Sequence, residues 1–557
     1  MGGLAVHQRP SSSSTASGPS NLIDATNAAY GLSTSGTAAA NTTALGLANT
    51  AAVAAGKRLW IPKGTYATTA GTFSALVMMD TGAILSASSG TLAFNGGVDW
   101  DISPHLTLTG TATATFSKQK TIVGYPEWWG AISNSAGTDC MAAINACLVA
   151  ITKTQLMPAT YYTSGAITVG LGAHSLYGAT HNLTGSTESI IKCTSSSATI
   201  LTISGTSSTG SSSTVEDVMV TRSVAPLISS ACIGVNVTAY YPRLTRIFSL
   251  ESMTGFKFNG TTGVWCTECK ASRSLAGTGG GTDTFKGFWM DGTSTGYGGN
   301  ASLYTHKAIV VTAAPFAGTS IGYYCDKKHS DLFFDHIETW QVTNGMEVVG
   351  DSSTGSIRSL DFKVIHGVFD SCYGSALKIS NTDQTANLSF TDMHLNCVTA
   401  GQKLLEVSNS NGSITLKGTQ YNSAGDTGAA ISVVNSTNVD SHGGIIMEAK
   451  LPMNLSGSSN CSFSDRTVNN INTGTGILLT NTSRCKFDNK MTGSKVGVGY
   501  KVLDALSGYN EFNCTGLDPT GITGGAANKL VINGTQVIAT GIAAAGHGTN
   551  VASGVMA

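Results

Sequence analysis

Charge is scarce in this chain of 557 residues. Lys, Arg, Asp and Glu make up 11% of it, and the net charge is −1, whereas roughly a quarter of an average soluble domain is charged. The chain has no basic block or stripe, which argues against nucleic acid as a partner. It has no apolar run of the about 20 residues needed to cross a bilayer, so we expect no membrane insertion. The N-terminus also lacks an apolar run of signal-peptide length, and we expect synthesis in a reducing cytoplasm.

A disulfide framework is missing too. The 12 cysteines stand one by one, often inside apolar runs, as at Cys193, Cys397 and Cys485. Disulfide frameworks belong to short secreted chains, so we expect reduced thiols that pack as small hydrophobes. Cys266 and Cys269 form a single CxxC without a second pair, and a zinc site needs about four ligands. We therefore expect no metal and no cofactor.

Glycine and short apolar runs are plentiful. The chain has 67 glycines, and 41% of its residues are hydrophobic. Ser, Thr, Asn and Gly fill the segments between the apolar runs, a mixture that by itself is compatible with disorder. The steady supply of Val, Ile, Leu and Phe favours a packed core instead. Many short strands joined by tight polar turns satisfy both observations, so the composition predicts an ordered all-β solenoid.

Four segments of the second half repeat one pattern. They begin at Leu332, Leu360, Leu388 and Ser413. When they are aligned, a first apolar column contains Phe334, Phe362, Phe390 and Leu416, and a second contains Val348, Ile379, Val407 and Val433. Regular recurrence at periods of roughly 20–50 residues indicates a solenoid in which each coil buries its apolar face against its neighbours. We expect each column to stack in register inside it.

The segment 125–178 carries the most specific pattern. It contains YPEWWGA (Tyr125 to Ala131), the helix-like TDCMAAINACLVAI (Thr138 to Ile151) and the strand-like LMPATYYTSGAITV (Leu156 to Val169). This order resembles the beginning of the right-handed parallel β-helix of the pectate-lyase-like family, in the form carried by bacteriophage tailspikes and tail fibres. The resemblance implies a capping helix below the first coil. It also implies a homotrimer that binds a bacterial surface polysaccharide and often cleaves it.

The same order of parts occurs earlier in the chain. An alanine-rich, helix-like stretch from Thr37 to Gly56 precedes RLWIPKGTYATTAG, which matches the later strand in type. We therefore expect four parts: a flexible virion-attachment arm (1–20), an N-terminal β-module for tail attachment (21–124), the β-helix body (125–516) and a C-terminal segment (517–557). The last part would either cap the final coil, whose open edge invites aggregation, or interlock three chains.

Polar side chains form a further column in the repeats, made by Glu338, His366, His394 and Gln420. Phe334 and Ile337 differ in parity, yet each begins an apolar column, and a flat strand cannot point both inward. A tight bend near Asp335 and His336 would allow this and would turn the polar column to the outer wall. Neighbouring coils lie about 4.8 Å apart, so we expect Glu338 and His366 to be close together.

Outward carboxylates in a groove are what glycan cleavage requires, with separations of about 5–5.5 Å in retaining and about 6.5–9.5 Å in inverting enzymes. Glu338 is the first candidate for the acid or base, with Asp370 or Asp392 as its partner and His366 and His394 as tuning or binding groups. Binding candidates are Asp335 and the aromatic residues Trp340, Tyr373 and Tyr421. Further aromatic candidates are Trp265, Trp289, Tyr297, Tyr304, Tyr323 and Tyr324. A merely solvated polar wall is the alternative interpretation.

The resemblance implies a phage tail spike or fibre located on the virion. It would dock to a tail or adaptor protein through its N-terminal region and recognise capsule, O-antigen or exopolysaccharide. We expect a glycoside hydrolase. A receptor-binding fibre without turnover remains an alternative. A polysaccharide lyase that uses His366 or His394 as its base is another.

Overall fold

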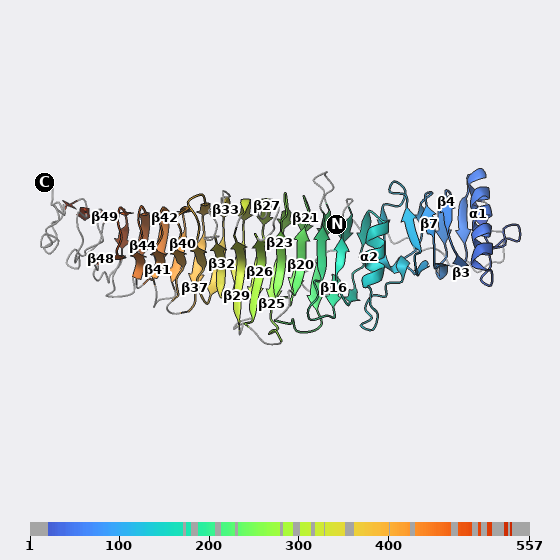
Figure 1. Ribbon diagram of the computed structural model, residues 1–557, viewed down its shortest axis with the longest axis horizontal. Helices are drawn as coiled ribbons and strands as arrows, with labels where there is room; N and C mark the ends of the chain where they lie inside the picture. Colours follow the sequence, from blue (N-terminus) through green and yellow to red (C-terminus); the bar gives the residue numbers. More distant parts are fainter. Residues whose placement is uncertain are drawn as a thin grey trace. The chain divides into compact units, whose positions relative to one another are not determined.

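The computed structural model is built almost entirely from β-strands (Figure 1). It describes residues 21–170, 174–179, 188–205, 213–228, 232–278, 282–292, 301–312, 318–327, 329–350, 361–399, 402–423, 429–449, 451–468, 477–492, 500–502, 510–514, 529–532 and 535–536. The predicted arm (1–20) lies outside these residues, as does most of the predicted C-terminal segment. The described residues divide into unit 1 (21–132 and 149–154) and unit 2 (133–148 and 155 onward). No helix among them is long and apolar enough to span a bilayer.

Unit 1 is a short three-sided solenoid. Its helix α1 (Ala38–Ala54) starts at Thr37, whose side chain accepts a hydrogen bond from the amide of Ala40. Strand β1 (Leu22–Asp24) pairs with the first of three coils. The coils are β2 (Arg58–Ile61), β3 (Gly64–Thr68) and β4 (Gly71–Phe73); β5 (Val77–Met79), β6 (Ala83–Ala87) and β7 (Thr91–Phe94); and β8 (Val98–Asp99), β9 (Leu106–Leu108) and β10 (Thr113–Phe116). Equivalent strands pair in parallel, which makes three small sheets.

Aromatic side chains fill the core of unit 1. Phe73, Phe94 and Phe116 stack on successive coils, with ring centroids 5.0 Å apart at each step. The YPEWWGA motif folds as the 3₁₀ turn η1 (Pro126–Trp129), which ends at Gly130. The indole nitrogen of Trp128 donates a 2.8 Å hydrogen bond to the carbonyl of Asp101, and its ring is buried. The tryptophan motif is therefore part of the core of unit 1.

The predicted helix near Thr138 to Ile151 is confirmed as α2 (Met141–Ala150). Asp139 fixes its start, because its carboxylate accepts hydrogen bonds from the amide of Met141 (3.0 Å) and from the hydroxyl of Ser164 (2.5 Å). Two short strands flank this region, β11 (Val123–Gly124) and β12 (Lys153–Gln155), and they pair in parallel. Among the described residues, α2 is the one helix of the body.

Unit 2 is a long right-handed parallel β-helix, and each coil contributes a strand to each of three walls. Face A contains β15 (Ser175–Tyr177), β18 (Thr214–Glu216), β21 (Arg243–Thr245), β24 (Trp265–Thr267), β27 (Ala301–His306), β30 (Ser330–Asp335), β33 (Asp361–Ile365), β36 (Asn387–Thr391), β39 (Ser413–Lys417), β46 (Lys486–Phe487), β49 (Glu511–Cys514), β50 (Lys529–Ile532) and β51 (Thr535–Gln536). Face B contains β13 (Thr160–Thr163), β16 (Ser189–Cys193), β19 (Val218–Arg222), β22 (Phe248–Leu250), β25 (Lys270–Arg273), β28 (Ile309–Thr312), β31 (Glu338–Trp340), β34 (Val368–Cys372), β37 (His394–Cys397), β40 (Gln420–Ser423) and β47 (Lys490–Thr492).

Two long strands, β42 (Val439–Met447) and β44 (Ser462–Val468), run through both of these faces. Face C contains β14 (Ile167–Val169), β17 (Leu201–Ser204), β20 (Ile233–Thr238), β23 (Thr254–Asn259), β26 (Thr284–Asp291), β29 (Thr319–Asp326), β32 (Asn344–Val349), β35 (Leu377–Ser380), β38 (Leu405–Ser408), β41 (Ala429–Val434), β43 (Leu451–Ser456), β45 (Ile477–Thr480) and β48 (Tyr500–Val502). The predicted all-β solenoid is confirmed.

A single left-handed residue makes the corner between faces A and B. The corner residues Asp217, Arg246, Glu268, Lys307, His336, His366 and Asp392 have φ of 50 to 59°. One such residue reverses the parity of the strand, so Phe334 before the corner and Ile337 after it are both buried. The predicted bend near Asp335 and His336 is thus confirmed. The corner also points the side chain at its tip away from the core.

The pairing register corrects one predicted column. Phe334 pairs with Val364, which pairs with Phe390, and Phe390 pairs with Leu416. Phe362 pairs with Leu332 on one side and Leu388 on the other, so its place in the first column was wrong. Leu360, Phe362 and Val364 share one parity, so the hydrophobic pattern alone cannot distinguish the true register from one that is shifted by two residues.

The second column is confirmed in full: Val348, Ile379, Val407 and Val433 pair in succession. The prediction for the cysteines holds as well. Eleven of the 12 cysteines are buried, and none of these eleven forms a disulfide.

Candidate functional site

Three aromatic rings form a ladder on the outside of face A. Trp265, Tyr304 and Phe333 occupy the same position on successive coils. Their ring centroids lie 4.7 Å apart between Trp265 and Tyr304 and 5.2 Å apart between Tyr304 and Phe333. Trp265 is 52% exposed, and the other two rings are half-buried. Tyr304 and Phe333 stack on each other, with their planes 7° apart, and Trp265 is tilted by 50° to Tyr304, so the ladder is a continuous apolar strip along the solenoid axis.

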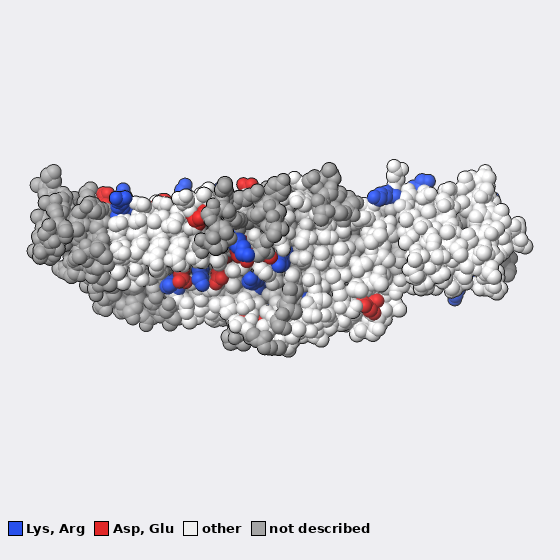
Figure 2. Space-filling view, viewed as in Figure 1, with Lys and Arg blue, Asp and Glu red and all other residues white. Residues whose placement is uncertain are grey.

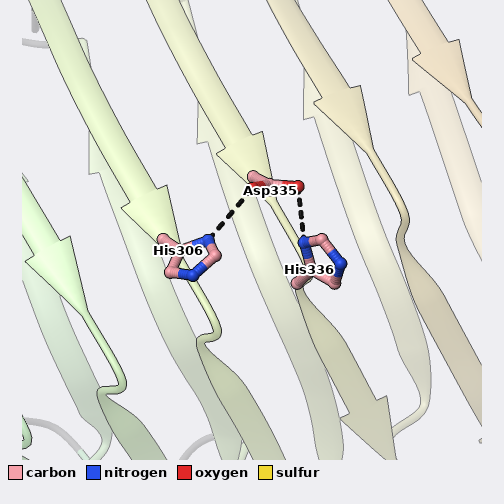
Figure 3. A group of neighbouring side chains, drawn as sticks. All are labelled: His306, Asp335 and His336. Carbon is pink, nitrogen blue, oxygen red and sulfur yellow. Dashed lines mark hydrogen bonds and ion pairs between the residues drawn. The ribbon is translucent and has the colours of Figure 1, made fainter.

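Next to the ladder, histidines from three coils surround one carboxylate. Figure 3 shows two of them, His306 and His336, with Asp335. We call His306, Asp335, His336 and His366 the corner cluster. Asp335 Oδ2 accepts from Nδ1 of His306 at 3.0 Å, and Oδ1 accepts from Nδ1 of His336 at 2.6 Å and of His366 at 3.3 Å. Burial alone would raise the pKa of the Asp335 carboxyl, but these three hydrogen bonds bring its pKa below the ordinary value. Asp335 is therefore a stable carboxylate.

The predicted polar column divides into two groups. Glu338 pairs with Val368, which pairs with His394, and His394 pairs with Gln420. His366 does not belong to this column, because it is a corner residue equivalent to His336 and Asp392. The expectation that His366 pairs with Glu338 was wrong for the same reason as in the apolar column, a shift of two residues. His366 instead contacts Asp335, and its Nε2 lies 3.8 Å from Asp392 Oδ2.

Face B carries two carboxylates beside an exposed tryptophan. Trp340 is 41% exposed, and its indole nitrogen donates to Glu338 Oε2 at 3.2 Å. Trp340 pairs across the coils with Asp370, whose carboxylate accepts from Asn396 at 2.5 Å. The register between β34 and β37 shifts just after Phe369, so Asp370 stands at a bulge, a feature often found beside functional sites.

The other predicted residues have mixed outcomes. Tyr421 is fully buried, pairs with Leu395 on the inner side of face B, and bonds to Ser441 Oγ at 2.9 Å. Its prediction as a sugar-binding residue was wrong, because strand alternation points it into the core. Tyr373 follows β34 and is half-buried. His394 is half-buried too, and its Nε2 is buried without a hydrogen-bond partner among the described residues.

A second pair of carboxylates, which was not among the sequence predictions, lies on face C. Asp291 and Asp326 end successive strands and stand in register. Asp291 is buried and forms a 2.8 Å ion pair with Lys257. Asp326 accepts from the amide of Gly292 (2.9 Å) and from the indole of Trp289 (3.2 Å). Burial, helped by the charge of Asp291, raises the pKa of the Asp326 carboxyl.

Cations and aromatic rings surround the face C pair. Lys286 Nζ lies 3.8 Å from the ring centroid of Trp289 and 3.9 Å from that of Tyr324. Burial lowers the pKa of Lys286, and burial raises the pKa of Tyr324 to about 12. Figure 2 shows a group of charged side chains in one area of the long body, where most of the other described atoms are white. The segments FWMD and YYCD, each an aromatic residue two positions before a strand-ending Asp, were the available sequence signal.

Comparison with known proteins gives a structural likeness only. No protein-family model matches the chain, and no curated protein matches it. Tailspike protein 3 of bacteriophage CBA120 is similar at 12% identity and a TM-score of 0.41, over 75% of this chain and 62% of that one. The Agl-KA catalytic domain is similar at 12% identity and a TM-score of 0.37, over 74% of this chain and 68% of that one.

The mannuronan C-5 epimerase AlgE6 A-module of Azotobacter vinelandii is similar at 12% identity and a TM-score of 0.30, over 74% of this chain and 98% of that one. The chain thus spans about three fifths of the tailspike protein that it resembles. At these identities and scores no functional argument rests on the likeness. The residues of this chain's own walls carry the proposals below.

Proposed function

We propose that this chain binds a bacterial surface polysaccharide along the outer wall of faces A and B and hydrolyses it, as the tail spike of a phage. The observation that carries this proposal is the exposed ladder of Trp265, Tyr304 and Phe333, which runs parallel to the solenoid axis. A chain of sugar rings is itself a long ribbon with apolar faces and polar edges. The exposed ring of Trp265 and the apolar strip that continues from it would contact these faces, and the carboxylates and imidazoles next to it would bind the hydroxyls.

We assign hydrolysis to Glu338 and Asp370, which flank Trp340. They lie on adjacent coils and two positions apart along the strand, which corresponds to about 8 Å between their α-carbons at ordinary strand spacings. Side chains that extend in parallel from these positions would keep a similar separation between their carboxyl groups, and about 6.5–9.5 Å between carboxyl groups suits an inverting mechanism, which leaves room for a water between acid and base. Glu338 would protonate the leaving oxygen and Asp370 would activate the water. His394 and Asp392 lie close enough along the wall to bind neighbouring hydroxyls, and Asp335, which stays ionised, would accept hydrogen bonds from the sugar.

The face C pair offers a second location for the same chemistry. A glycosidase needs one carboxyl that stays protonated and one that stays ionised. The raised pKa of Asp326 suits the acid, and the ion pair with Lys257 suits Asp291 as the charged partner. The burial of Asp291 limits access of a sugar, which is why we favour the wall of faces A and B.

Incubation with a panel of capsules, O-antigens and exopolysaccharides, followed by a reducing-end assay, tests the proposal. Glu338→Gln should lower the rate of release by about 10²–10⁴-fold and leave polysaccharide binding intact. Asp326→Asn should have little effect, and Asp488→Asn, an outward carboxylate paired with Lys486 on a late coil, is the matched control. The reverse pattern would move the site to face C.

Two other products of this assay would change the function itself. Binding of a polysaccharide without release of any oligosaccharide would indicate a receptor-binding fibre. Products with a new carbon–carbon double bond in the uronate ring would indicate a lyase.

We further propose that the chain acts as a homotrimer on the virion and docks to the tail through its N-terminal region, residues 1–124. Unpaired outer walls poor in charge favour coverage by other copies. Light scattering of the full chain and of a form without residues 517–557 tests this assembly. We expect a trimer in the first case and a monomer or aggregate in the second, and a stable trimer in both would place the assembly contacts elsewhere.

A further inference from the structure

The corner cluster brings together the donor atoms that a transition metal prefers. One ligand atom from each of His306, Asp335 and His336 lies within 4.8 Å of the other two, and Figure 3 shows the two imidazoles on either side of the carboxylate. His366 supplies a fourth donor, with its Nδ1 3.3 Å from Asp335 Oδ1. Imidazole and carboxylate donors in this ratio suit zinc and its neighbours, whereas calcium and magnesium take oxygen ligands.

The distances are close to those of a four-coordinate site. Zinc binds histidine nitrogen and carboxylate oxygen at about 2.0–2.2 Å, so tetrahedral ligand atoms lie about 3.3 Å from one another. The three contacts of Asp335 with histidine Nδ1 atoms are 2.6, 3.0 and 3.3 Å. We expect binding to require only rotation of the side chains, of which His336 and His366 are exposed and His306 and Asp335 are half-buried.

The backbone under the cluster is fixed by the solenoid. The amide of His336 donates to the carbonyl of Ile365 at 3.0 Å, and the amide of His366 donates to that of Thr391 at 3.0 Å. His306 and Asp335 are in-register partners in neighbouring strands. All four ligands thus stand on hydrogen-bonded strand ends and corners, which pre-organises them.

A carboxylate also stands behind one of the ligands. Asp392 is the corner residue of the next coil, and its Oδ2 lies 3.8 Å from Nε2 of His366. Metal-binding histidines commonly direct the other ring nitrogen to a carboxylate, which orients the ring and strengthens the ligand. His366 with Nδ1 toward the cluster and Nε2 toward Asp392 has this arrangement.

We propose that the corner cluster binds one divalent transition-metal ion of the zinc type. His306, Asp335 and His336 are the ligands, His366 completes the set, and Asp392 orients His366. The proposal does not depend on glycan cleavage. The site adjoins the aromatic ladder, because the ring centroids of His306 and Tyr304 are 6.3 Å apart, so a bound ion is placed to contact an anionic or hydroxyl group of a ligand on that ladder.

Isothermal titration of the tag-free, chelator-treated full chain with Zn²⁺ tests the proposal, with Mg²⁺ and Ca²⁺ as competitors. We expect one Zn²⁺ per chain and no displacement by a large excess of the competitors. Asp335→Asn and His336→Asn should each weaken binding by at least about tenfold. Asn is chosen at His336 because it tolerates the left-handed backbone. Asp392→Asn should weaken binding by about tenfold, as expected for a group that orients a ligand.

His442→Asn is the matched control, because this histidine also lies on face A but contacts Ser464 (3.2 Å) instead of the cluster. Its affinity for Zn²⁺ should equal that of the wild type. Co²⁺ should give the visible absorption of a four-coordinate ion in the wild type and lose it in His336→Asn. A folded wild type that binds no Zn²⁺, or variants that bind it unchanged, would overturn the proposal.

Discussion

Units 1 and 2 are both three-sided parallel solenoids, but they build their turns differently. Within the described residues of unit 1, every residue with positive φ is a glycine, such as Gly64, Gly82 and Gly90. In unit 2, most of the described positions with positive φ carry a side chain, and many of them stand at the corner of faces A and B. A left-handed residue with a side chain is disfavoured by roughly 1–2 kcal/mol relative to its ordinary conformation.

The difference shows what a solenoid corner can provide. A glycine turn is smooth and presents only backbone, whereas a left-handed His, Asp, Lys or Arg projects a functional group outward from a rigid edge. The corner cluster stands on such an edge. Unit 1 has the same architecture without this row of side chains, so the chemistry that we propose belongs to unit 2 because of its corners.

The largest effect on stability is expected from substitutions in unit 2, at two neighbouring residues that lie on opposite sides of one strand. Phe334 is fully buried, and Phe333 is on the outer wall. Phe334→Ala should lower the free energy of unfolding by about 3–5 kcal/mol. Phe333→Ala should change it by less than about 1 kcal/mol, since it empties no core position, and weaken polysaccharide binding instead. Chemical denaturation and a binding assay on both variants check this, and equal losses of stability would contradict the assignment of walls.

The two units should respond differently to a fall in pH, and unit 2 should lose stability first. Burial lowers the pKa of His329 in unit 2 to about 4, below its ordinary 6.5, so the folded state holds it neutral. The unfolded chain then binds more protons as pH falls from 6.5 to 4, and unit 2 should lose up to about 3 kcal/mol over that interval. His329→Gln should flatten this dependence, which denaturation at several pH values measures.

In unit 1, Asp101 contacts the buried His105 at 2.8 Å. Burial opposes ionisation of Asp101, but hydrogen bonds from Ser103 and Thr81 and the charge of His105 lower its pKa below 3.8. Its contribution to stability is present above pH 3.8 and is lost as pH falls through the lowered pKa. Unit 1 should therefore keep this contribution in the interval where unit 2 loses stability, and simultaneous loss in both units would contradict the comparison.

Exchanging glycine and non-glycine residues at the positive-φ positions of the two units should give the smallest change in stability, and it tests the comparison most directly. Gly90 has φ of 79°, and a Cβ there would lie 2.9 Å from the carbonyl oxygen of Thr69. Gly90→Asn should destabilise unit 1 by about 1–3 kcal/mol, because it adds left-handed strain and this close contact. His336→Gly should leave unit 2 unchanged or up to about 1 kcal/mol more stable, because glycine carries no strain at positive φ. Thermal unfolding measures both, and a large loss in His336→Gly would show that the corner side chain stabilises the fold.

Much of the fold was predictable, because short segments of the sequence already show the pattern of inward and outward residues that defines a coil. Inward residues recur once per coil, and the parity change between Phe334 and Ile337 indicated the corner. The register of β33 was not predictable in the same way, since Leu360, Phe362 and Val364 are all apolar and alternate correctly. Only the backbone pairing places Val364 opposite Phe334.

That register error is also why the candidate site was predicted only in part. Alignment on the parity change would have placed His336, His366 and Asp392 in one row, because each separates two inward residues of opposite parity. The shift of two residues placed His366 beside Glu338 instead. The convergence of three imidazoles on Asp335 depends on side-chain directions at three coils, which no spacing in the sequence specifies. The face C pair was missed because its strands precede the four aligned repeats.

The left-handed corner also has a consequence for how such a wall changes during evolution. Each corner side chain points outward from one residue, and the inward residues on both sides of it remain in their columns whatever the corner carries. A substitution at Lys307, His336, His366 or Asp392 therefore changes one side chain of the surface and leaves the core columns the same. Recognition of a new ligand can therefore evolve through single amino-acid substitutions at individual coils, while the fold stays the same.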